Sequence, residues 1–118
     1  MLTRAFAETF AHEWLSAWND RDIDRILSHY ADDIVFHSPR IAAVMDNDAH
    51  TVHGKKALQA YWTAALSQAR QLYFDLDDIL VSSDAVTLLY TNHREERVAE
   101  TFVFNDECEV RLSIAAYR

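Results

Sequence analysis

The chain contains very few of the residues that break secondary structure or cross-link a fold: one glycine, one proline and one cysteine in 118 residues. Cys108 has no second cysteine for an internal disulfide, which indicates a reducing compartment such as the cytoplasm. The N-terminus lacks the basic and apolar regions of a signal peptide, and no apolar run is long enough to cross a bilayer. We therefore expect a cytoplasmic protein that does not enter a membrane.

Positive charge is also scarce, because 11 lysines and arginines face 19 aspartates and glutamates, for a net charge of -8. A nucleic-acid-binding protein needs a basic stripe, and the sequence has none. The acidic balance also argues against binding to anionic membranes. Half of the residues are hydrophobic and 12% are aromatic, which is enough for a core at this length. With no linker or repeat, residues 1–118 are predicted to form one domain.

The beginning of the chain is predicted to form two helices. In the first helix, aromatic residues recur every four positions and so share one face: Phe6, Phe10, Trp14 and Trp18. The second helix is predicted to follow the N-cap Asp22 and to end at Asp32 and Asp33. Its buried residues are predicted to be Ile23, Ile26, Leu27 and Tyr30.

After these helices, residues 34–38 favour a strand, which must stop or lie on a sheet edge at Pro39 because proline has no N–H. Residues 40–53 are predicted as a loop with a brief strand, and Gly54 then opens a third helix. Four alternating stretches follow, joined by short turns: LYFDL, AVTLLYTNH, RVAETFVF and EVRLSIAAY. The apolar parity slips at residues 77–78, which indicates a bulge. Helices followed by an antiparallel meander predict an α+β fold.

Three stretches of sequence, which together span most of the chain, carry a family resemblance: WLSAWNDRDIDRILSHYADDIVFHSP, HGKKALQAYW and ETFVFNDECEVRLSIAAY. In their order and spacing they resemble the nuclear transport factor 2-like superfamily, and within it the SnoaL-like and ketosteroid-isomerase-like branch. The resemblance implies a cystatin-like α+β roll, in which a cone-shaped, half-barrel sheet packs on three helices around a mostly apolar pocket. It also implies a dimer, since members of the family are commonly dimeric.

The resemblance also identifies two positions where ketosteroid isomerases carry catalytic groups and this chain does not. The carboxylate that precedes the proline of the first strand in those enzymes is replaced by Ser38. Serine needs a second base for such chemistry, and the neighbouring His37 would point to the opposite face of the strand. The tyrosine that donates to the oxyanion corresponds to Trp14, whose indole N–H donates but transfers no proton. The isomerase reaction in its known form is therefore not expected.

A third isomerase position is partly kept. Those enzymes carry a protonated aspartate four residues before a phenylalanine, and here Glu100 lies four residues before Phe104. Strand alternation turns Glu100 to the same face as Phe102 and Phe104, where desolvation would raise its pKa. Glu100 is therefore the candidate catalytic acid or base. The alternative, equally open, is a buried structural carboxylate paired with an arginine: Arg94, Arg97 or Arg111.

The pocket around Glu100 is expected to be lined from both the helices and the sheet. The residues predicted to line it are Trp14, Trp18, Phe36, Ser38, Arg40, Tyr61, Tyr90, Asn92 and Phe102. For Arg40 and Asn92, a solvent-facing position is an open alternative. No metal or cofactor is expected, because His50 and His53 lie in a loop without further ligands at metal-binding spacing.

The sequence thus predicts a domain that binds a small hydrophobic molecule. Its pocket would suit lyase, isomerase, cyclase or hydratase chemistry, with Glu100 as acid or base. The loss of two isomerase groups leaves a second hypothesis open, in which the domain senses a ligand or associates with a protein without catalysis. Alternate residues on the outer sheet face further predict a homodimer. These residues are Thr87, Leu89, Thr91, Ala99, Thr101, Val103, Leu112 and Ile114.

Overall fold

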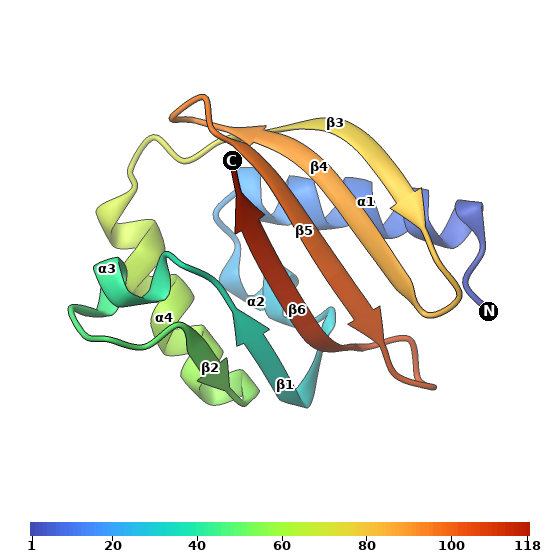
Figure 1. Ribbon diagram of the computed structural model, residues 1–118, viewed down its shortest axis with the longest axis horizontal. Helices are drawn as coiled ribbons and strands as arrows, with labels where there is room; N and C mark the ends of the chain where they lie inside the picture. Colours follow the sequence, from blue (N-terminus) through green and yellow to red (C-terminus); the bar gives the residue numbers. More distant parts are fainter.

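The computed structural model describes residues 1–118 and contains four helices and one six-stranded sheet (Figure 1). The helices are α1 (Arg4–Asn19), α2 (Ile23–Leu27), α3 (Ile41–Met45) and α4 (Lys55–Gln68). The strands are β1 (Tyr30–His37), β2 (Thr51–His53), β3 (Phe74–Val81), β4 (Ala85–Asn92), β5 (Arg97–Phe104) and β6 (Val110–Tyr117). None of the helices combines the length and apolar character needed to cross a membrane.

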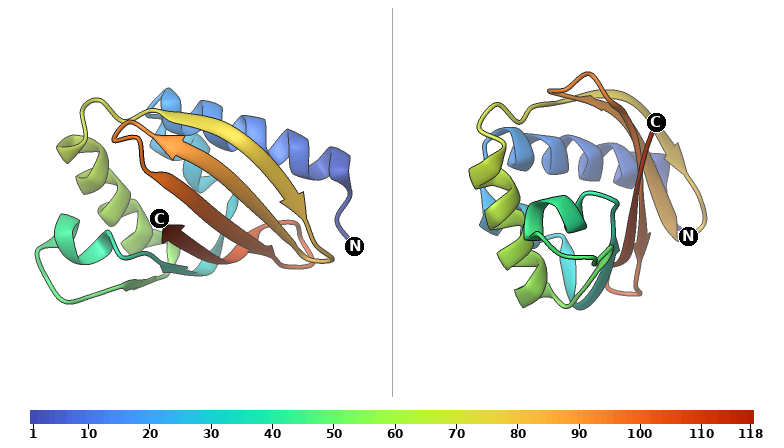
Figure 2. Two further views of the ribbon diagram at one scale, coloured as in Figure 1. Left: turned by 45° about the horizontal axis from the view of Figure 1, so that its top comes forward. Right: turned by 60° about the vertical axis from the view of Figure 1, so that its left-hand side comes forward.

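The strands lie in the order β2–β1–β6–β5–β4–β3 and form a curved sheet that does not close into a barrel (Figure 2). Strands β3 to β6 form the predicted antiparallel meander. Strand β1 joins β6 in parallel, an addition that the sequence pattern did not reveal. The register between β3 and β4 shifts between Leu76 and Asp78, which confirms the predicted bulge. Such a bulge bends its strand and so helps the sheet to curve around the helices.

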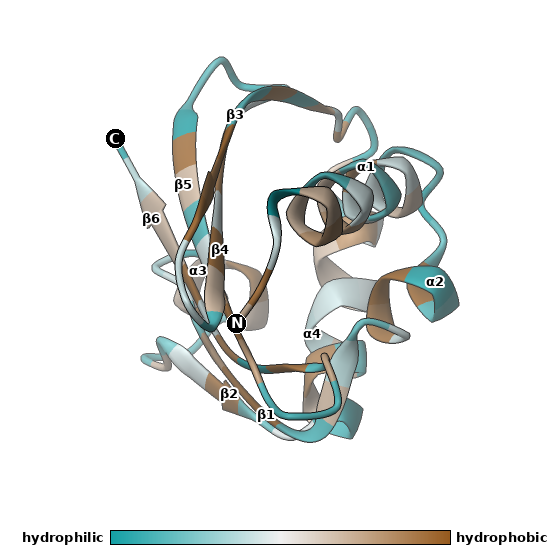
Figure 3. Ribbon diagram, turned by 90° about the vertical axis from the view of Figure 1, so that its right-hand side faces the viewer, coloured by the Kyte–Doolittle hydropathy of each residue, from teal (hydrophilic) through white to brown (hydrophobic).

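Helices α1, α2 and α4 cover one face of the sheet (Figure 3). The aromatic stripe of α1 faces the sheet as predicted, with Phe10, Trp14 and Trp18 buried and Phe6 half-buried. Phe10 and Trp14 both pack edge-on against Phe102 of β5, at ring-centre distances of 4.9 and 5.1 Å. Such aromatic pairs add specific contacts to the hydrophobic burial and hold α1 across the concave face.

The segment between the first and last long helices departs from the sequence-based prediction. Asp22 caps α2 as predicted, but the helix is only five residues long and does not extend to Asp32 and Asp33. Those aspartates are exposed residues inside β1, which begins at Tyr30 because that residue already pairs with β6. The loop predicted over residues 40–53 contains the short helix α3 as well as the brief strand β2.

A candidate acid–base and ligand-binding site

A cavity of about 130 Å³ lies between the sheet and helices α1, α3 and α4. Its walls come from all three helices and from every strand except β2, and 13 of its 20 lining residues are hydrophobic. A single buried water needs only roughly 10–15 Å³. The cavity is therefore large enough for a small organic molecule, and its walls are mostly apolar, as binding sites for such molecules usually are.

The structure brings nearly all of the predicted pocket residues to this cavity. Those that line it are Trp14, Trp18, Phe36, Ser38, Arg40, Tyr61, Tyr90, Asn92 and Glu100. Phe102 does not line the cavity, because its ring is fully buried against Phe10 and Trp14 in the core. Strand alternation assigns Phe102 and Glu100 to the same face of β5, but alternation alone does not separate a core position from a cavity position.

Glu100 is the only acidic residue that lines the cavity. It is 4% exposed, and its carboxyl group lies between β4 and β6. Tyr90 Oη donates a 2.8 Å hydrogen bond to Oε1, and Ser113 Oγ donates a 3.2 Å hydrogen bond to Oε2. Burial raises the pKa of Glu100 from 4.5 to about 7, although both hydrogen bonds act in the opposite direction. Both protonation states are therefore populated near neutral pH.

No arginine pairs with Glu100. Arg94, Arg97 and Arg111 are exposed, and none of the four ion pairs in the structure includes Glu100. Arg97 and Arg111 lie on β5 and β6, outside the set of residues that line the cavity. The geometry thus agrees with the first of the two alternatives for Glu100, a carboxyl group held by neutral donors alone.

Four tyrosines are affected by the charge of this carboxyl group, and one of them, Tyr90, bonds to it directly. Burial is the largest cause of a raised pKa in Tyr30, Tyr61, Tyr90 and Tyr117, and the charge on ionised Glu100 adds to it in each case. The pKa of Tyr117, for example, rises to about 12. All but Tyr30 line the cavity, so these side chains present neutral O–H groups to its interior.

Trp14 and Trp18 both line the cavity, but they differ in their indole N–H groups. Trp14 Nε1 donates a 2.9 Å hydrogen bond to the hydroxyl oxygen of Tyr30 and is not free to bind a ligand. Trp18 Nε1 is buried and has no hydrogen-bond partner. Buried N–H groups are seldom left unpaired in proteins. The N–H of Trp14 is therefore engaged within the protein, whereas that of Trp18 is left without a partner.

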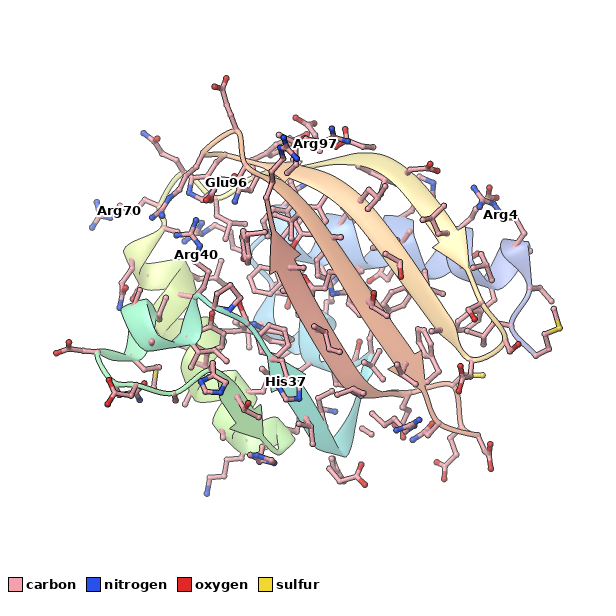
Figure 4. All side chains as sticks on the ribbon, viewed as in Figure 1. Arg4, His37, Arg40, Arg70, Glu96 and Arg97 are labelled. Atoms are coloured by element: carbon pink, nitrogen blue, oxygen red, sulfur yellow. The ribbon has the colours of Figure 1, made fainter.

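Ser38 lies in the cavity wall without a base beside it. Its hydroxyl oxygen accepts a 3.2 Å hydrogen bond from the backbone N–H of Arg40 and thereby shapes the turn into α3. His37, labelled in Figure 4, has its Nδ1 3.0 Å from Thr51 Oγ1 and does not bond to Ser38. The alternation of these two side chains is as predicted, and it leaves Ser38 without the activation that a nucleophile needs.

The outer end of the cavity carries charged groups, in contrast to its interior. Arg40 forms an ion pair with Glu96, the two residues labelled next to each other in Figure 4. Glu96 also accepts a 3.0 Å hydrogen bond from Asn92 Nδ2. This hydrogen bond and the charge of Arg40 lower the pKa of Glu96. The Arg40 guanidinium lies 5.0 Å from the ring centre of Tyr117, a cation–π distance.

Several lining residues were not found from the sequence: Val44, Trp62, Ala65, Gln68, Ala69, Leu72, Phe74, His93, Arg94, Ala115 and Tyr117. His93 and Arg94 carried a usable signal, because they directly follow Asn92, a predicted pocket residue at the end of β4. Val44 carried none, since it belongs to α3, which the sequence did not predict. No cluster of three metal-binding side chains exists, and both histidines are exposed, His50 just before β2 and His53 at its end.

The fold and the cavity together define the class of protein. A curved, unclosed sheet packed on helices around a cavity is a cystatin-like α+β roll. A structural neighbour from Methylobium petroleophilum is described as having the same cystatin-like fold. The SnoaL-like domain family matches residues 11–111, which is most of the chain. The protein therefore belongs to the SnoaL-like family.

Solved structures agree with this assignment. A SnoaL-like protein of unknown function from Burkholderia thailandensis is 35% identical, with a TM-score of 0.92 and coverage of 100% of this chain and 99% of that one. A putative polyketide cyclase from Sinorhizobium meliloti is 14% identical, with a TM-score of 0.75 and coverage of 92% and 94%. A Mycobacterium tuberculosis protein bound to estradiol-17beta-hemisuccinate is 18% identical, with a TM-score of 0.76 and coverage of 95% and 93%. A search of curated proteins gave no match.

Proposed function

We propose that the protein binds a small, mostly apolar molecule in the cavity and that Glu100 transfers protons to or from it. The observation that carries this proposal is a buried carboxyl group, without a cation beside it, in the wall of an apolar cavity. Burial of such a group disfavours its ionised form and so shifts its pKa. A strongly shifted titratable group in a cavity is a candidate for acid–base chemistry.

A carboxyl group with a pKa of about 7 suits proton transfer at neutral pH. As a carboxylate, Glu100 accepts a proton from a substrate carbon next to a carbonyl group. As the resulting acid, it returns that proton to another atom of the same molecule. The neutral hydroxyls of Tyr61 and Tyr117 would stabilise the negative charge that develops on the substrate oxygen. Isomerisation, cyclisation, elimination and hydration all use steps of this kind.

Two structural neighbours support a hydrophobic ligand of this class. One is named as a putative polyketide cyclase, and another was crystallised with an estradiol derivative. Their low sequence identities mean that they share the fold with this chain, which by itself does not determine function. They therefore support the kind of molecule we propose for the cavity, while the role of Glu100 depends on the geometry described above.

A binding module without catalysis is a second candidate, and two observations favour it. Ser38 has no base to activate it, and the indole N–H of Trp14 is engaged by Tyr30. Glu100 would then act only as a hydrogen-bonding group that selects ligands by their polar atoms. The two candidates share the cavity and the ligand class, and they differ in whether a proton leaves the ligand.

The two candidates can be separated with 2-acetonaphthone, an apolar ketone whose methyl protons are weakly acidic. We expect calorimetry to detect its binding, and NMR in D₂O to detect exchange of its methyl protons for deuterium. Glu100→Gln should keep the binding and slow the exchange by roughly 10²–10⁴-fold, the usual contribution of a general acid or base. The matched control is Glu107→Gln, which removes an exposed glutamate from the turn after β5 and should change neither measurement.

The outcomes differ for each candidate. Binding without exchange in the wild-type protein would favour the binding module. Exchange that survives in Glu100→Gln would contradict the role of Glu100. Loss of exchange together with loss of binding would point to a damaged cavity, which the binding isotherm of the variant detects independently. Absence of binding to the wild-type protein would contradict the proposal for this ligand class.

We further propose that the protein forms a homodimer through the outer face of the sheet. On this face Ile114 is 43% exposed, and its predicted companions on β4 and β5 are only half-buried in the single chain. An apolar sheet face of this kind favours association with a second copy. Light scattering at micromolar concentration should give the mass of a dimer, and a monomer would contradict the proposal. The cytoplasmic location also stays a prediction.

A further inference from the structure

The outer end of the cavity, which we call the mouth, is basic in a chain that is otherwise acidic. Three basic residues line the cavity there: Arg40, His93 and Arg94. They come from the start of α3 and from the turn between β4 and β5, segments that are distant in sequence. The net charge of the chain is -8, so a group of basic residues in the wall of the cavity differs in sign from the charge of the chain as a whole.

The two arginines at the mouth differ in whether they have an ion-pair partner. Arg40 is balanced by Glu96, which it contacts directly, and its guanidinium also lies over the ring of Tyr117. Arg94 takes part in no ion pair, although its backbone N–H bonds to Asn92. The mouth therefore presents one guanidinium group, that of Arg94, without a direct ion-pair partner at the edge of an apolar cavity.

His93 is affected by the charges of both arginines, and one of its ring nitrogens has no hydrogen-bond partner. Its Nδ1 is buried in the wall of the cavity without a hydrogen-bond partner. Burial lowers the pKa of His93, and the charges of Arg94 and Arg40 lower it further. A negative group bound at the mouth would be attracted by those charges.

We propose that the mouth is a carboxylate-binding subsite and that the natural ligand is an amphipathic acid. Its ring system would occupy the aromatic part of the cavity, and its carboxylate would bind the Arg94 guanidinium and the His93 imidazole. The inference rests on the proposed function, because it assumes that the cavity binds a ligand, and it adds the chemical class and the orientation of that ligand.

A carboxylate fits the mouth better than other anions. The Arg94 guanidinium has no ion-pair partner, and its planar fork of donors matches the two oxygens of a carboxylate. The apolar walls behind it disfavour a phosphate dianion, whose desolvation would cost more. Glu100 lies in the interior and repels a second negative group when it is ionised. The acid group is therefore directed to the mouth, and the opposite end of the ligand is directed to Glu100.

The test compares 2-naphthoate with 2-naphthamide, which have the same ring system and nearly the same shape but differ in charge. We expect calorimetry at low salt to show that 2-naphthoate binds about tenfold more tightly, the lower range for a hydrogen bond to a charged group. Arg94→Gln should remove this preference by weakening 2-naphthoate alone. The matched control is Arg97→Gln, which removes the same charge from an exposed position outside the cavity and should preserve the preference.

A second measurement follows the His93 ring by NMR. Saturation with 2-naphthoate should raise the pKa of His93, whereas saturation with 2-naphthamide should not, because only the first ligand brings a negative charge to the mouth. Equal affinities for the two ligands, or equal weakening of both by Arg94→Gln, would overturn the carboxylate subsite and leave the proposed function intact. Absence of binding by both ligands would contradict the subsite and the proposed function together.

Discussion

Glu96 and Glu100 are four residues apart in the sequence, Glu96 beside the mouth of the cavity and Glu100 in its wall, and their pKa values move in opposite directions. Glu96 lies at the mouth, half-exposed, and a hydrogen bond from Asn92 and the charge of Arg40 lower its pKa. Glu100 lies in the interior, where burial raises its pKa to about 7. The same side chain is therefore a stable anion at one end and a neutral-pH acid at the other.

The difference between the two glutamates is a difference in their partners. Glu96 contacts a permanent cation, Arg40, which favours the ionised form at every pH of interest. Glu100 has only the neutral donors Tyr90 and Ser113, which stabilise its ionised form less than burial destabilises it. The first arrangement fixes a charge in place, whereas the second leaves a proton free to be exchanged. This is why we propose a structural role for Glu96 and proton transfer for Glu100.

The largest effect is expected from removing the ring of Trp18, one of the aromatic side chains that line the cavity. Trp18 packs against Trp62 and Phe74, at ring-centre distances of 5.1 and 5.6 Å. Trp18→Ala should lower the free energy of unfolding by roughly 3–5 kcal/mol, which urea denaturation would measure. Trp14→Phe should keep the fold and cost less, because most of the ring volume remains, although the buried hydroxyl of Tyr30 loses its hydrogen bond from the indole N–H. Equal and negligible effects of the two changes would show that the aromatic face of α1 does not contribute to the core.

A smaller effect, with a definite sign, is expected from Glu100→Gln. The folded protein holds the proton on Glu100 up to a pKa of about 7, whereas the unfolded chain releases it near 4.5. Stability should therefore fall as the pH rises between these values. The glutamine variant lacks this loss and should gain roughly 3 kcal/mol over wild type between pH 4 and pH 8. Urea denaturation at the two pH values measures the difference. If the free energies of unfolding of the wild type and the variant changed with pH in the same way, the raised pKa of Glu100 would be contradicted.

The smallest effect is expected from Glu96→Gln. The lowered pKa of Glu96 contributes stability above the ordinary glutamate pKa, and this contribution disappears as the pH falls through the folded value. Because the pair with Arg40 is partly exposed, its loss at pH 7 should cost only about 0.2–1 kcal/mol. At neutral pH Glu96→Gln should lower the free energy of unfolding, whereas Glu100→Gln should raise it. Urea denaturation curves of the two variants would show this difference in sign. A loss of several kcal/mol in the free energy of unfolding would show that the Glu96–Arg40 pair is shielded from solvent as strongly as Glu100.

The sequence predicted the fold well because its signals were local and periodic. The four-residue spacing in α1 and the alternation in β5 correctly assigned Trp14, Trp18 and Phe102 to the buried side. The parallel pairing of β1 with β6 was not predictable in this way, since it joins segments far apart in the chain. Neither was α3, whose five residues are too few to show a helical period.

The site was predicted less completely, because hydrogen-bond partners depend on the three-dimensional arrangement of side chains. The sequence could place Glu100 on the inner face of β5 but could not show whether an arginine would reach it. Among the arginines that line the cavity, the one that forms an ion pair is Arg40, and its partner is Glu96. Likewise, the spacing of the tryptophans could not show that Tyr30 engages Trp14 and leaves the N–H of Trp18 free.

The central claim is that Glu100 is a buried carboxyl group without a cationic partner, and its own titration tests this most directly. NMR of the side-chain carboxyl carbon, followed from acid to alkaline pH, reports the pKa of this residue, with Glu100→Gln to assign the signal. We predict a midpoint of about 7, well above the ordinary value of 4.5. A midpoint below 4.5 would mean that a positive charge stabilises the carboxylate, and it would contradict the assignment of Glu100 as the acid–base group.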